Sequence, residues 1–305
     1  MTTRFRAGFN VLNKDGIVLA SALGLAAPTV ASHEASAESR GGKVLVVLSS
    51  AKEYQLRDGV RYKAGYYLDE LAIPVRKMID AGFTPVFANP KGDDPVFDPH
   101  SNNSILFNGD DAKRKEALDF VNGYYAIHHP KTLAAVAREG TSQYVGIYVP
   151  GGFSPMEDLM QDKTLGQILL SFHTTGRPTG LLCHGPAALL STLSDPAAFR
   201  KAIVAGDYLG ASKLSDGWAY KGYHMTADSQ AEESKIEGPA QQMGGYLPLY
   251  VSDALAQAGA HVDRVGLWGV NVVEDREVVS GQQPFSSHAL GDAFVAKLLR
   301  ANPSR

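Results

Sequence analysis

The stretch GLLCHGPAALL occupies residues 180–190 and contains Cys183, the single cysteine of the chain. An apolar run ends directly at Cys-His-Gly-Pro, and an Ala/Leu-rich run typical of a helix follows at once. A strand that turns this sharply into a helix is a nucleophile elbow, whose central residue has strained backbone geometry and projects above the carboxyl edge of a sheet. Gly185 permits close backbone approach, and Pro186 suits the first helical turn. The stretch predicts an α/β enzyme with Cys183 as its nucleophile.

Short apolar runs on either side of the elbow predict the other strands of a sheet. Residues 44–48, 84–88, 145–149 and 178–182 are almost continuously apolar, as strands buried on both faces are. Alternation of such strands with helices predicts a parallel-sheet sandwich with helices on both faces. Helical patterns occupy residues 69–82, 112–122, 165–174, 186–193, 247–258 and 288–299, and a further short strand is expected at 277–280. Pro74 is expected in the first turn of its helix, where proline is tolerated.

The pattern predicts one domain over residues 43–300, with an insertion around residues 89–143, and a different segment before it. Residues 1–37 contain basic residues, then an apolar run at 17–31, then Ala-Ser-Ala, which predicts a signal peptide and export to the periplasm or the medium. A mitochondrial presequence and a disordered leader without function are the alternatives, and without a signal the protein would be cytoplasmic. Since a span needs about 20 apolar residues, no membrane span is expected.

Composition narrows the classes of partner. The chain has 305 residues, 44% of them hydrophobic, which is enough for a substantial core. Its formal net charge is −3 and no Lys/Arg-rich run is present, so nucleic acid is not an expected partner. One cysteine excludes an intramolecular disulfide. We expect a small-molecule substrate and a homodimer, the commonest soluble assembly.

The position of Cys183 predicts a reactive thiol. The helix N-terminus behind it has partial positive charge, which favours the thiolate and lowers the pKa of the thiol. His184 follows directly and is the expected general base. The alternative is that Cys183 is a small buried core residue without chemistry. Adjacent histidines at 128 and 129 are a weak indication of a metal site, because neighbours on a helix point to different faces, and no metal is predicted.

Residues 180–190 resemble the cysteine elbow of the ThiJ/PfpI (class I glutamine amidotransferase-like) superfamily. The resemblance covers roughly residues 43–299 and implies a flavodoxin-like α/β fold. Other segments are similar to the heat-shock chaperone and glyoxalase III branch. These segments are Gly65-x4-Glu70-x3-Pro74, Asp98-Pro99-His100-Ser101, Val149-Pro150-Gly151-Gly152 with Pro155-Met156-x-Asp158-Leu159, and Gly281-Gln282-Gln283-Pro284-x-Ser286-Ser287.

The resemblance implies roles for two glutamates. The family's acidic partner of the cysteine falls on Glu70, whose carboxyl group would be protonated and donate a hydrogen bond to sulfur. A solvated glutamate in the first helical turn is the alternative reading of Glu70. The glutamate that orients the histidine falls within residues 226–233, where spacing favours Glu233 over Glu232.

The segment after the third strand is expected to bind the substrate oxygen. The backbone N–H groups of Gly152 and His184 are the expected oxyanion donors, with Gly151 and Phe153 beside them. Many relatives have Gly-Gly-His-Gly here, whereas this chain has Gly-Gly-Phe-Ser. Phe153 therefore replaces a polar group with an aromatic ring at the expected pocket mouth, and the substrate could differ accordingly.

The resemblance implies a cysteine enzyme that needs no cofactor and acts on small 2-oxoaldehydes, converting methylglyoxal to lactate, or on their protein adducts. A cysteine hydrolase or peptidase of the same superfamily is one alternative. True amidotransferases have a C-terminal His-x-Glu, whereas His288 is followed by Ala-Leu, which argues against ammonia transfer. A stress-related holdase chaperone, with Cys183 as an oxidation sensor, is the other alternative.

Overall fold

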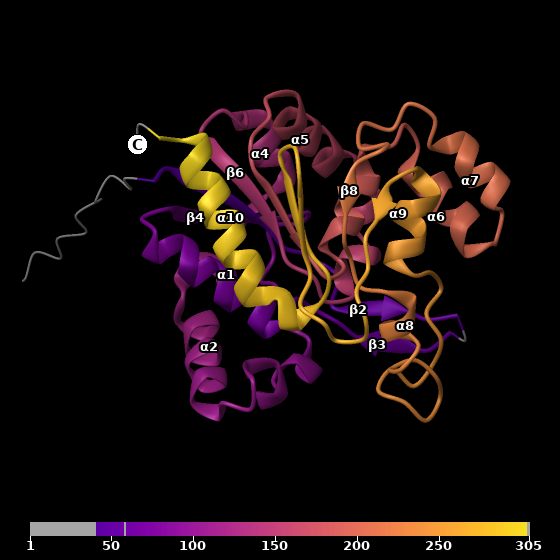
Figure 1. The fold of residues 1–305 in the computed structure, drawn as a ribbon, viewed down its shortest axis with the longest axis horizontal. Helices are drawn as coiled ribbons and strands as arrows, with labels where there is room; N and C mark the ends of the chain where they lie inside the picture. Colours follow the sequence, from indigo (N-terminus) through magenta and orange to yellow (C-terminus); the bar gives the residue numbers. More distant parts are fainter. Residues whose placement is uncertain (1–40, 58, 304–305) are drawn as a thin grey trace, which may run out of the picture. The chain divides into compact units, whose positions relative to one another are not determined.

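A computed structural model describes residues 41–57 and 59–303, all within a unit that spans residues 38–305. The predicted leader, residues 1–37, lies outside the described residues and stays a prediction. A seven-stranded sheet lies at the centre of this unit (Figure 1). In order across the sheet, its strands are β10 (Val272–Asp275), β11 (Val278–Gly281), β7 (Thr179–Leu182), β6 (Tyr144–Val149), β1 (Lys43–Val47), β4 (Thr84–Asn89) and β5 (Lys131–Thr132).

The sheet is mostly parallel, as the sequence predicts. Strand β10 alone in this sheet runs antiparallel, against β11. Strand β7, which leads into the elbow, lies between β6 and β11, with Leu181 opposite both Val149 and Ser280. The end of β7 is therefore flanked by the carboxyl ends of two other strands. Strand β5 comes from the predicted insertion and lengthens the sheet beside β4, a strand that the sequence did not indicate.

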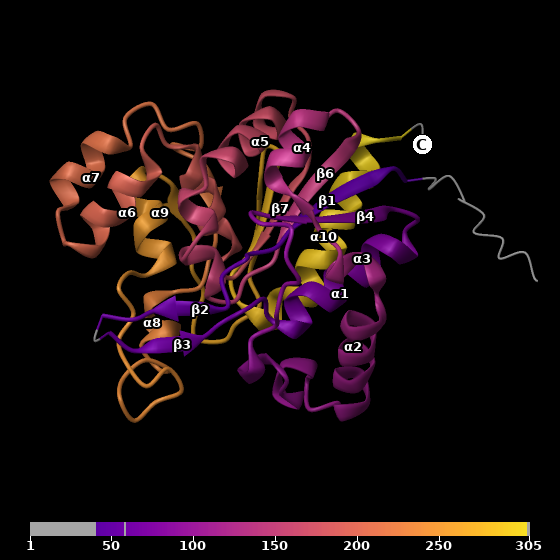
Figure 2. The same cartoon turned by 180° about the vertical axis from the view of Figure 1, so that it is seen from behind.

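Two helical layers cover the sheet (Figures 1 and 2). Helices α1 (Leu68–Asp80) and α10 (Ser287–Ala301) pack together on one face, with α2 (Asp111–Gly123) against α1. Helices α4 (Leu133–Glu139) and α5 (Lys163–Thr174) lie on the other face, where α5 contacts the 3₁₀ segment η5 (Gly185–Thr192). Strand β1 shows why both layers form. Val44 and Val46 belong to the core with α1 and α10, whereas Leu45 and Val47 belong to the opposite core.

Smaller elements complete the described residues. Helices α6, α7 and α9 form a group beside the end of η5, and neither α6 nor α7 was predicted. The predicted helix over residues 247–258 begins later, at Val251, with Tyr250 as its N-cap residue. The remaining elements are β2 (Glu53–Gln55), β3 (Arg61–Lys63), η1 (Pro99–Ser101), η2 (Ser104–Phe107), α3 (Tyr125–His128), η3 (Ser154–Met156), η4 (Leu159–Gln161), α6 (Pro196–Val204), α7 (Tyr208–Leu214), β8 (His224–Met225), α8 (Gln230–Glu233), α9 (Val251–Ala258), β9 (His261–Val262) and η6 (Pro284–Ser286). Within the part of the chain that the structure describes, no helix is both long enough and apolar enough to cross a membrane.

The prediction for Pro74 is wrong, because α1 begins at Leu68 and Pro74 lies in its interior. A proline there has no N–H to donate, so the carbonyl of Glu70, four residues earlier, loses its helical partner. The hydroxyl of Tyr148 donates to this carbonyl over 2.5 Å. A side chain from β6 thus replaces the missing helical bond and ties Glu70 to the sheet.

A pair of variants in β6 tests this replacement. We expect Tyr148→Phe to lower the free energy of unfolding by about 1–3 kcal/mol, since a buried carbonyl would lose its donor. Tyr144 is also buried in β6, and its hydroxyl has no partner among the described residues. Tyr144→Phe is therefore the control and is expected to leave stability unchanged or slightly raised. Urea unfolding of both variants measures the difference, and equal effects would contradict the account.

Candidate active site

Cys183 lies at a sharp turn between β7 and η5. Its φ of 59° is in the left-handed region, which residues other than glycine rarely adopt. The backbone holds this conformation from both sides, because the Cys183 N–H donates to the Gly281 carbonyl and the Cys183 carbonyl accepts from the Asp228 N–H. Gly185 follows where a Cβ atom would lie 2.2 Å from the Val149 carbonyl oxygen. This is the nucleophile elbow that the sequence predicts, although the helix behind it is 3₁₀ rather than α.

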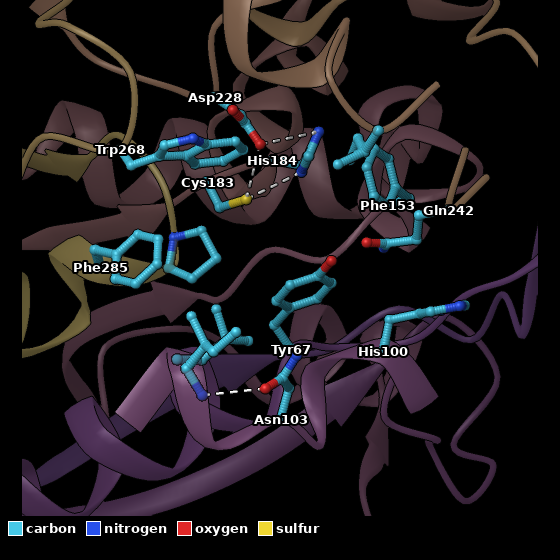
Figure 3. Close-up of a pocket in the computed structure, with 14 residues that line it drawn as sticks. Tyr67, His100, Asn103, Phe153, Cys183, His184, Asp228, Gln242, Trp268 and Phe285 are labelled. Atoms are coloured by element: carbon cyan, nitrogen blue, oxygen red, sulfur yellow. Dashed lines mark hydrogen bonds and ion pairs between the residues drawn. The ribbon is translucent and has the colours of Figure 1, made fainter. Parts of the chain in front are cut away.

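A hydrogen-bonded chain of three buried side chains leads away from the thiol, and Figure 3 shows its first contact, between Cys183 and His184. The Cys183 Sγ lies 3.1 Å from His184 Nδ1, and His184 Nε2 lies 2.8 Å from Glu233 Oε1. Each of the three side chains is at most 2% exposed. The imidazole therefore connects the sulfur to a carboxyl group, the geometry of a Cys-His-Glu triad.

Helix α8 directs the two neighbouring glutamates, Glu232 and Glu233, to different partners. Ser229 and Glu232 form a capping box that begins this one-turn helix, and Glu232 also accepts from the Gln282 side chain and the Trp268 N–H. Glu233 points to the other side and reaches His184. The structure thus brings Glu233, the glutamate that the spacing favoured, to His184. Glu232 has a structural position instead.

Burial keeps the imidazole neutral. It lowers the pKa of His184 to about 4, although the negative charge of Asp228 opposes the change. At neutral pH the Nε2–H group donates to Glu233, and Nδ1 is then free to accept a proton from sulfur. His184 is thus in the protonation state that a general base requires.

The expectation of a lowered thiol pKa is wrong. Burial raises the pKa of Cys183 well above its ordinary value, and the charges of Glu70 and Asp228 raise it further. A hydrogen bond from the Gly152 N–H acts in the opposite direction. Removal from water and two nearby carboxyl groups outweigh the helix N-terminus. Cys183 is thus a protonated thiol at neutral pH, and it needs His184 to remove the proton during attack.

Glu70 also contacts the sulfur. It is fully buried in the first turn of α1, and its Oε2 accepts from the Gly151 N–H over 2.8 Å. Burial, followed by the charge of Asp69, raises the pKa of Glu70, whereas a hydrogen bond with Cys183 lowers it. The solvated-glutamate alternative is therefore wrong. Glu70 is placed to share a proton with sulfur, and this role stays a prediction.

The turn after β6 passes directly against the elbow. A Cβ atom on Gly151 would lie 2.6 Å from the Cys183 Cβ and 2.7 Å from the backbone nitrogen of His184. Gly152 has a φ of 85°, and its N–H faces the Cys183 side chain. Because the Gly151 N–H is already bonded to Glu70, Gly151 is not a free oxyanion donor. Gly152 remains available for that role.

Phe153 forms a wall of the site rather than its mouth. It is 1% exposed, and its ring centroid lies 4.3 Å from that of His184. The hairpin of β2 and β3 supports it, since Tyr54 stacks on Phe153 and Tyr62 meets its edge. Phe153 therefore holds the imidazole in place and excludes water from it.

The sulfur faces a cavity of about 330 Å³ (Figure 3). Several of its lining residues were not predicted from the sequence, among them Asp228, Trp268 and Tyr67. Asp228 Oδ2 lies 3.7 Å from Sγ and 4.0 Å from His184 Nε2. Asp228 belongs to the stretch searched for the triad acid, and Tyr67 precedes Glu70 closely, so both could have been noticed. No pattern in the sequence indicated Trp268.

One group of side chains in the described residues could hold a metal ion, and it coincides with this site. Ligand atoms of Cys183, His184 and Asp228 all lie within 4.8 Å of one another. A thiolate, an imidazole and a carboxylate suit zinc, but binding would consume the nucleophile itself. The histidines at 128 and 129 are apart from it. His128 pairs with Asp94, and the imidazole of His129 contacts the Tyr125 carbonyl.

Comparison with known proteins gives a consistent picture. The DJ-1/PfpI family matches residues 119–194, which include β6, α5, β7 and the elbow. The protein/nucleic acid deglycase HchA of Pseudomonas aeruginosa (strain UCBPP-PA14) is 25% identical over 267 residues, which is 86% of this chain and 82% of that protein. The matched segment is a DJ-1/PfpI family domain. HchA of Staphylococcus aureus (strain Newman) is likewise 25% identical, over 88% of this chain and 84% of that protein.

A solved structure has a similar fold. The crystal structure of glyoxalase III from Candida albicans matches with a TM-score of 0.65 and 22% identity, over 85% of this chain and 98% of that chain. At this identity the likeness shows the fold alone. The predictions of the superfamily, of its branch and of the α/β fold are confirmed.

Alkylation of the thiol tests the electrostatics of this DJ-1/PfpI site. Because the pKa of Cys183 is raised, its reaction with iodoacetamide is expected to accelerate at higher pH than that of a free cysteine, whose pKa is about 8.5. Glu70→Gln removes an ionisable group whose charge and hydrogen bond raise the pKa of Cys183, so we expect the midpoint of the pH profile of alkylation to move to lower pH. N-acetylcysteine is the reference thiol. A wild-type midpoint below that reference, or an upward shift in the variant, would contradict the assignment.

Proposed function

We propose that the protein is a cysteine enzyme that converts small 2-oxoaldehydes to 2-hydroxy acids, as in methylglyoxal to lactate, or removes their adducts from amines. The observation that carries the proposal is the buried chain from Cys183 through His184 to Glu233, which faces a cavity. The HchA relatives are deglycases by name, and a structural neighbour is a glyoxalase III by name. Both reactions begin with addition of a thiol to an aldehyde-derived carbon.

The first step forms a hemithioacetal. As Sγ bonds to the aldehyde carbon C1, the S–H proton passes to His184 Nδ1 and the C1=O π electrons move to oxygen. The Gly152 N–H is placed to donate to that oxygen, and Glu233 accepts from the imidazolium that forms. The imidazolium then returns its proton to the oxygen. The positive charge on His184 is present only between these two proton transfers, and Glu233 stabilises it during that interval. In the resting site the imidazole is neutral.

The second step is an internal oxidation and reduction, so its electron balance requires no external oxidant. His184 removes the C1 proton, the C1–H electron pair forms a C1=C2 bond, and the C2=O π electrons move to the C2 oxygen, which gives an enediolate. The imidazolium returns that proton to C2, and the C1 hydroxyl proton passes to the C2 oxygen as a C1=O bond forms, which produces a thioester. Water then cleaves the S–C1 bond, which releases the 2-hydroxy acid and restores the thiol. An amine adduct would enter the same route by exchanging its amine for sulfur at C1.

The alternatives differ in what supports them. His288 lines a separate cavity with Arg76 and Lys77, away from Cys183, which does not favour ammonia transfer of the amidotransferase type. The chaperone alternative has one favourable observation, a run of exposed apolar side chains over residues 265–270, which includes Leu267 and Val270. Client protection by that surface would not depend on the Cys183 thiol. The predicted homodimer and the predicted export stay proposals.

The direct test is lactate formation from methylglyoxal by the full chain, without an added thiol cofactor. We expect turnover by the wild type, its loss in Cys183→Ala, and a fall of about 10²–10⁴-fold in kcat for His184→Asn. His261→Asn is the matched control, because His261 is an exposed histidine of β9. Turnover that survives in Cys183→Ala, or its absence in the wild type, would overturn the proposal.

The glutamate of the triad can be tested separately. Glu233→Gln is expected to lower kcat by about 10²-fold or more, because a neutral amide stabilises the imidazolium less and can favour the wrong tautomer. Glu139→Gln, at an exposed glutamate on α4, is the control. Equal activity of the two variants would remove Glu233 from the mechanism.

A further inference from the structure

The cavity in front of Cys183 has two unlike walls (Figure 3). The rings of Trp268 and Phe285 lie together on one side of the sulfur, and Gln242 and His100 lie on the other. Ile105 adds to the apolar lining. A substrate carbonyl bonded to Sγ therefore has the Trp268 and Phe285 rings on one side, whereas the other side combines polar groups with the Phe153 ring.

Trp268 is held in place by its backbone. Its φ of 61° is in the left-handed region, which is unusual for an aromatic residue. Its N–H donates to Glu232 Oε1 over 2.8 Å, and the other oxygen of this buried carboxyl group accepts from Ser229 and Gln282. A strained backbone that a buried network maintains often marks a functional position. Cys183 is the other residue of this cavity with such a φ among those described.

The indole is fixed and still accessible. Its ring packs edge to face against Phe285, with centroids 6.3 Å apart, and the residue is 42% exposed. This arrangement leaves aromatic surface facing the cavity, where a planar group could stack. Transfer of exposed aromatic surface from water to contact with an apolar ligand is favourable. Because the indole is held rigidly beside the nucleophile, it favours a ligand with a planar apolar group.

The charge and the size of the cavity disfavour an anionic or a very small substituent on the substrate. The lining residues among those described include no lysine or arginine, whereas Asp228 lies at the sulfur. A carboxylate or phosphate on the substrate would therefore find no cationic partner. A three-carbon oxoaldehyde would leave most of the 330 Å³ cavity unfilled, and its methyl group offers little surface to two aromatic rings.

We propose that Trp268 and Phe285 form a subsite for a planar apolar substituent, so that the enzyme favours aryl 2-oxoaldehydes over methylglyoxal. The turnover part of this inference rests on the proposed function. Binding of the planar group does not, because it needs only the rings and the cavity.

The test compares kcat/KM for phenylglyoxal and methylglyoxal in initial-rate assays. Trp268→Asn removes the indole with a residue that tolerates positive φ, and Trp268→Phe restores an aromatic ring. We expect the phenylglyoxal to methylglyoxal ratio to fall by about 10–100-fold in Trp268→Asn and to recover partly in Trp268→Phe. Leu267→Ala is the control, since Leu267 is exposed on the same loop and does not line the cavity. Alkylation of Cys183 at an unchanged rate verifies that the nucleophile is intact.

A second readout is independent of chemistry. Acetophenone, an unreactive aryl ketone, is expected to show protein-dependent NMR line broadening that weakens in Trp268→Asn and persists in Leu267→Ala. An unchanged substrate ratio or unchanged broadening in Trp268→Asn would overturn the subsite. Wild-type protein that converts neither aldehyde would overturn the proposed function and the aryl preference in turnover, and acetophenone would then decide the subsite alone.

Discussion

The left-handed backbone at Cys183 is the constraint on which the rest of the site depends. Because of this conformation, the side chain projects from the turn between β7 and η5, beside the carboxyl ends of β6 and β11. The geometry leaves no space for side chains on Gly151 and Gly185. An added Cβ would lie within 2.7 Å of three atoms at Gly151, and 2.2 Å from the Val149 carbonyl oxygen at Gly185. Strain at one residue is offset by close packing of the surrounding turns.

Burial then determines how the thiol can react. Cys183, Glu70, Asp228 and Glu233 are all removed from water, so burial disfavours the charged form of each and raises its pKa. A permanently charged thiolate is therefore disfavoured. The neutral imidazole of His184 provides the alternative, because it can take the thiol proton at the moment of attack and transfer part of the new charge to Glu233.

The central strands and the elbow could be predicted from the sequence. Other features could not, because they depend on contacts that form only on folding. Continuous apolar runs gave the central strands, and the turn chemistry of residues 183–186 gave the elbow. The pKa of Cys183 could not be read, because burial and two acids distant in sequence outweigh the helix terminus. Pro74 was misplaced because its compensating hydroxyl comes from Tyr148, 78 residues beyond Glu70. Trp268 carries no local signal, since the Glu232 network that fixes it is assembled by folding.

The proposed mechanism requires a carbonyl substrate to become covalently bound to Cys183. The most direct measurement is rapid acid quenching of the wild-type enzyme during turnover of methylglyoxal, followed by peptide mass spectrometry. We expect one methylglyoxal-derived thioester adduct on the peptide with Cys183, absent when excess iodoacetamide has first blocked the thiol. Adducts confined to lysine and arginine side chains, with an unmodified Cys183 during turnover, would contradict it.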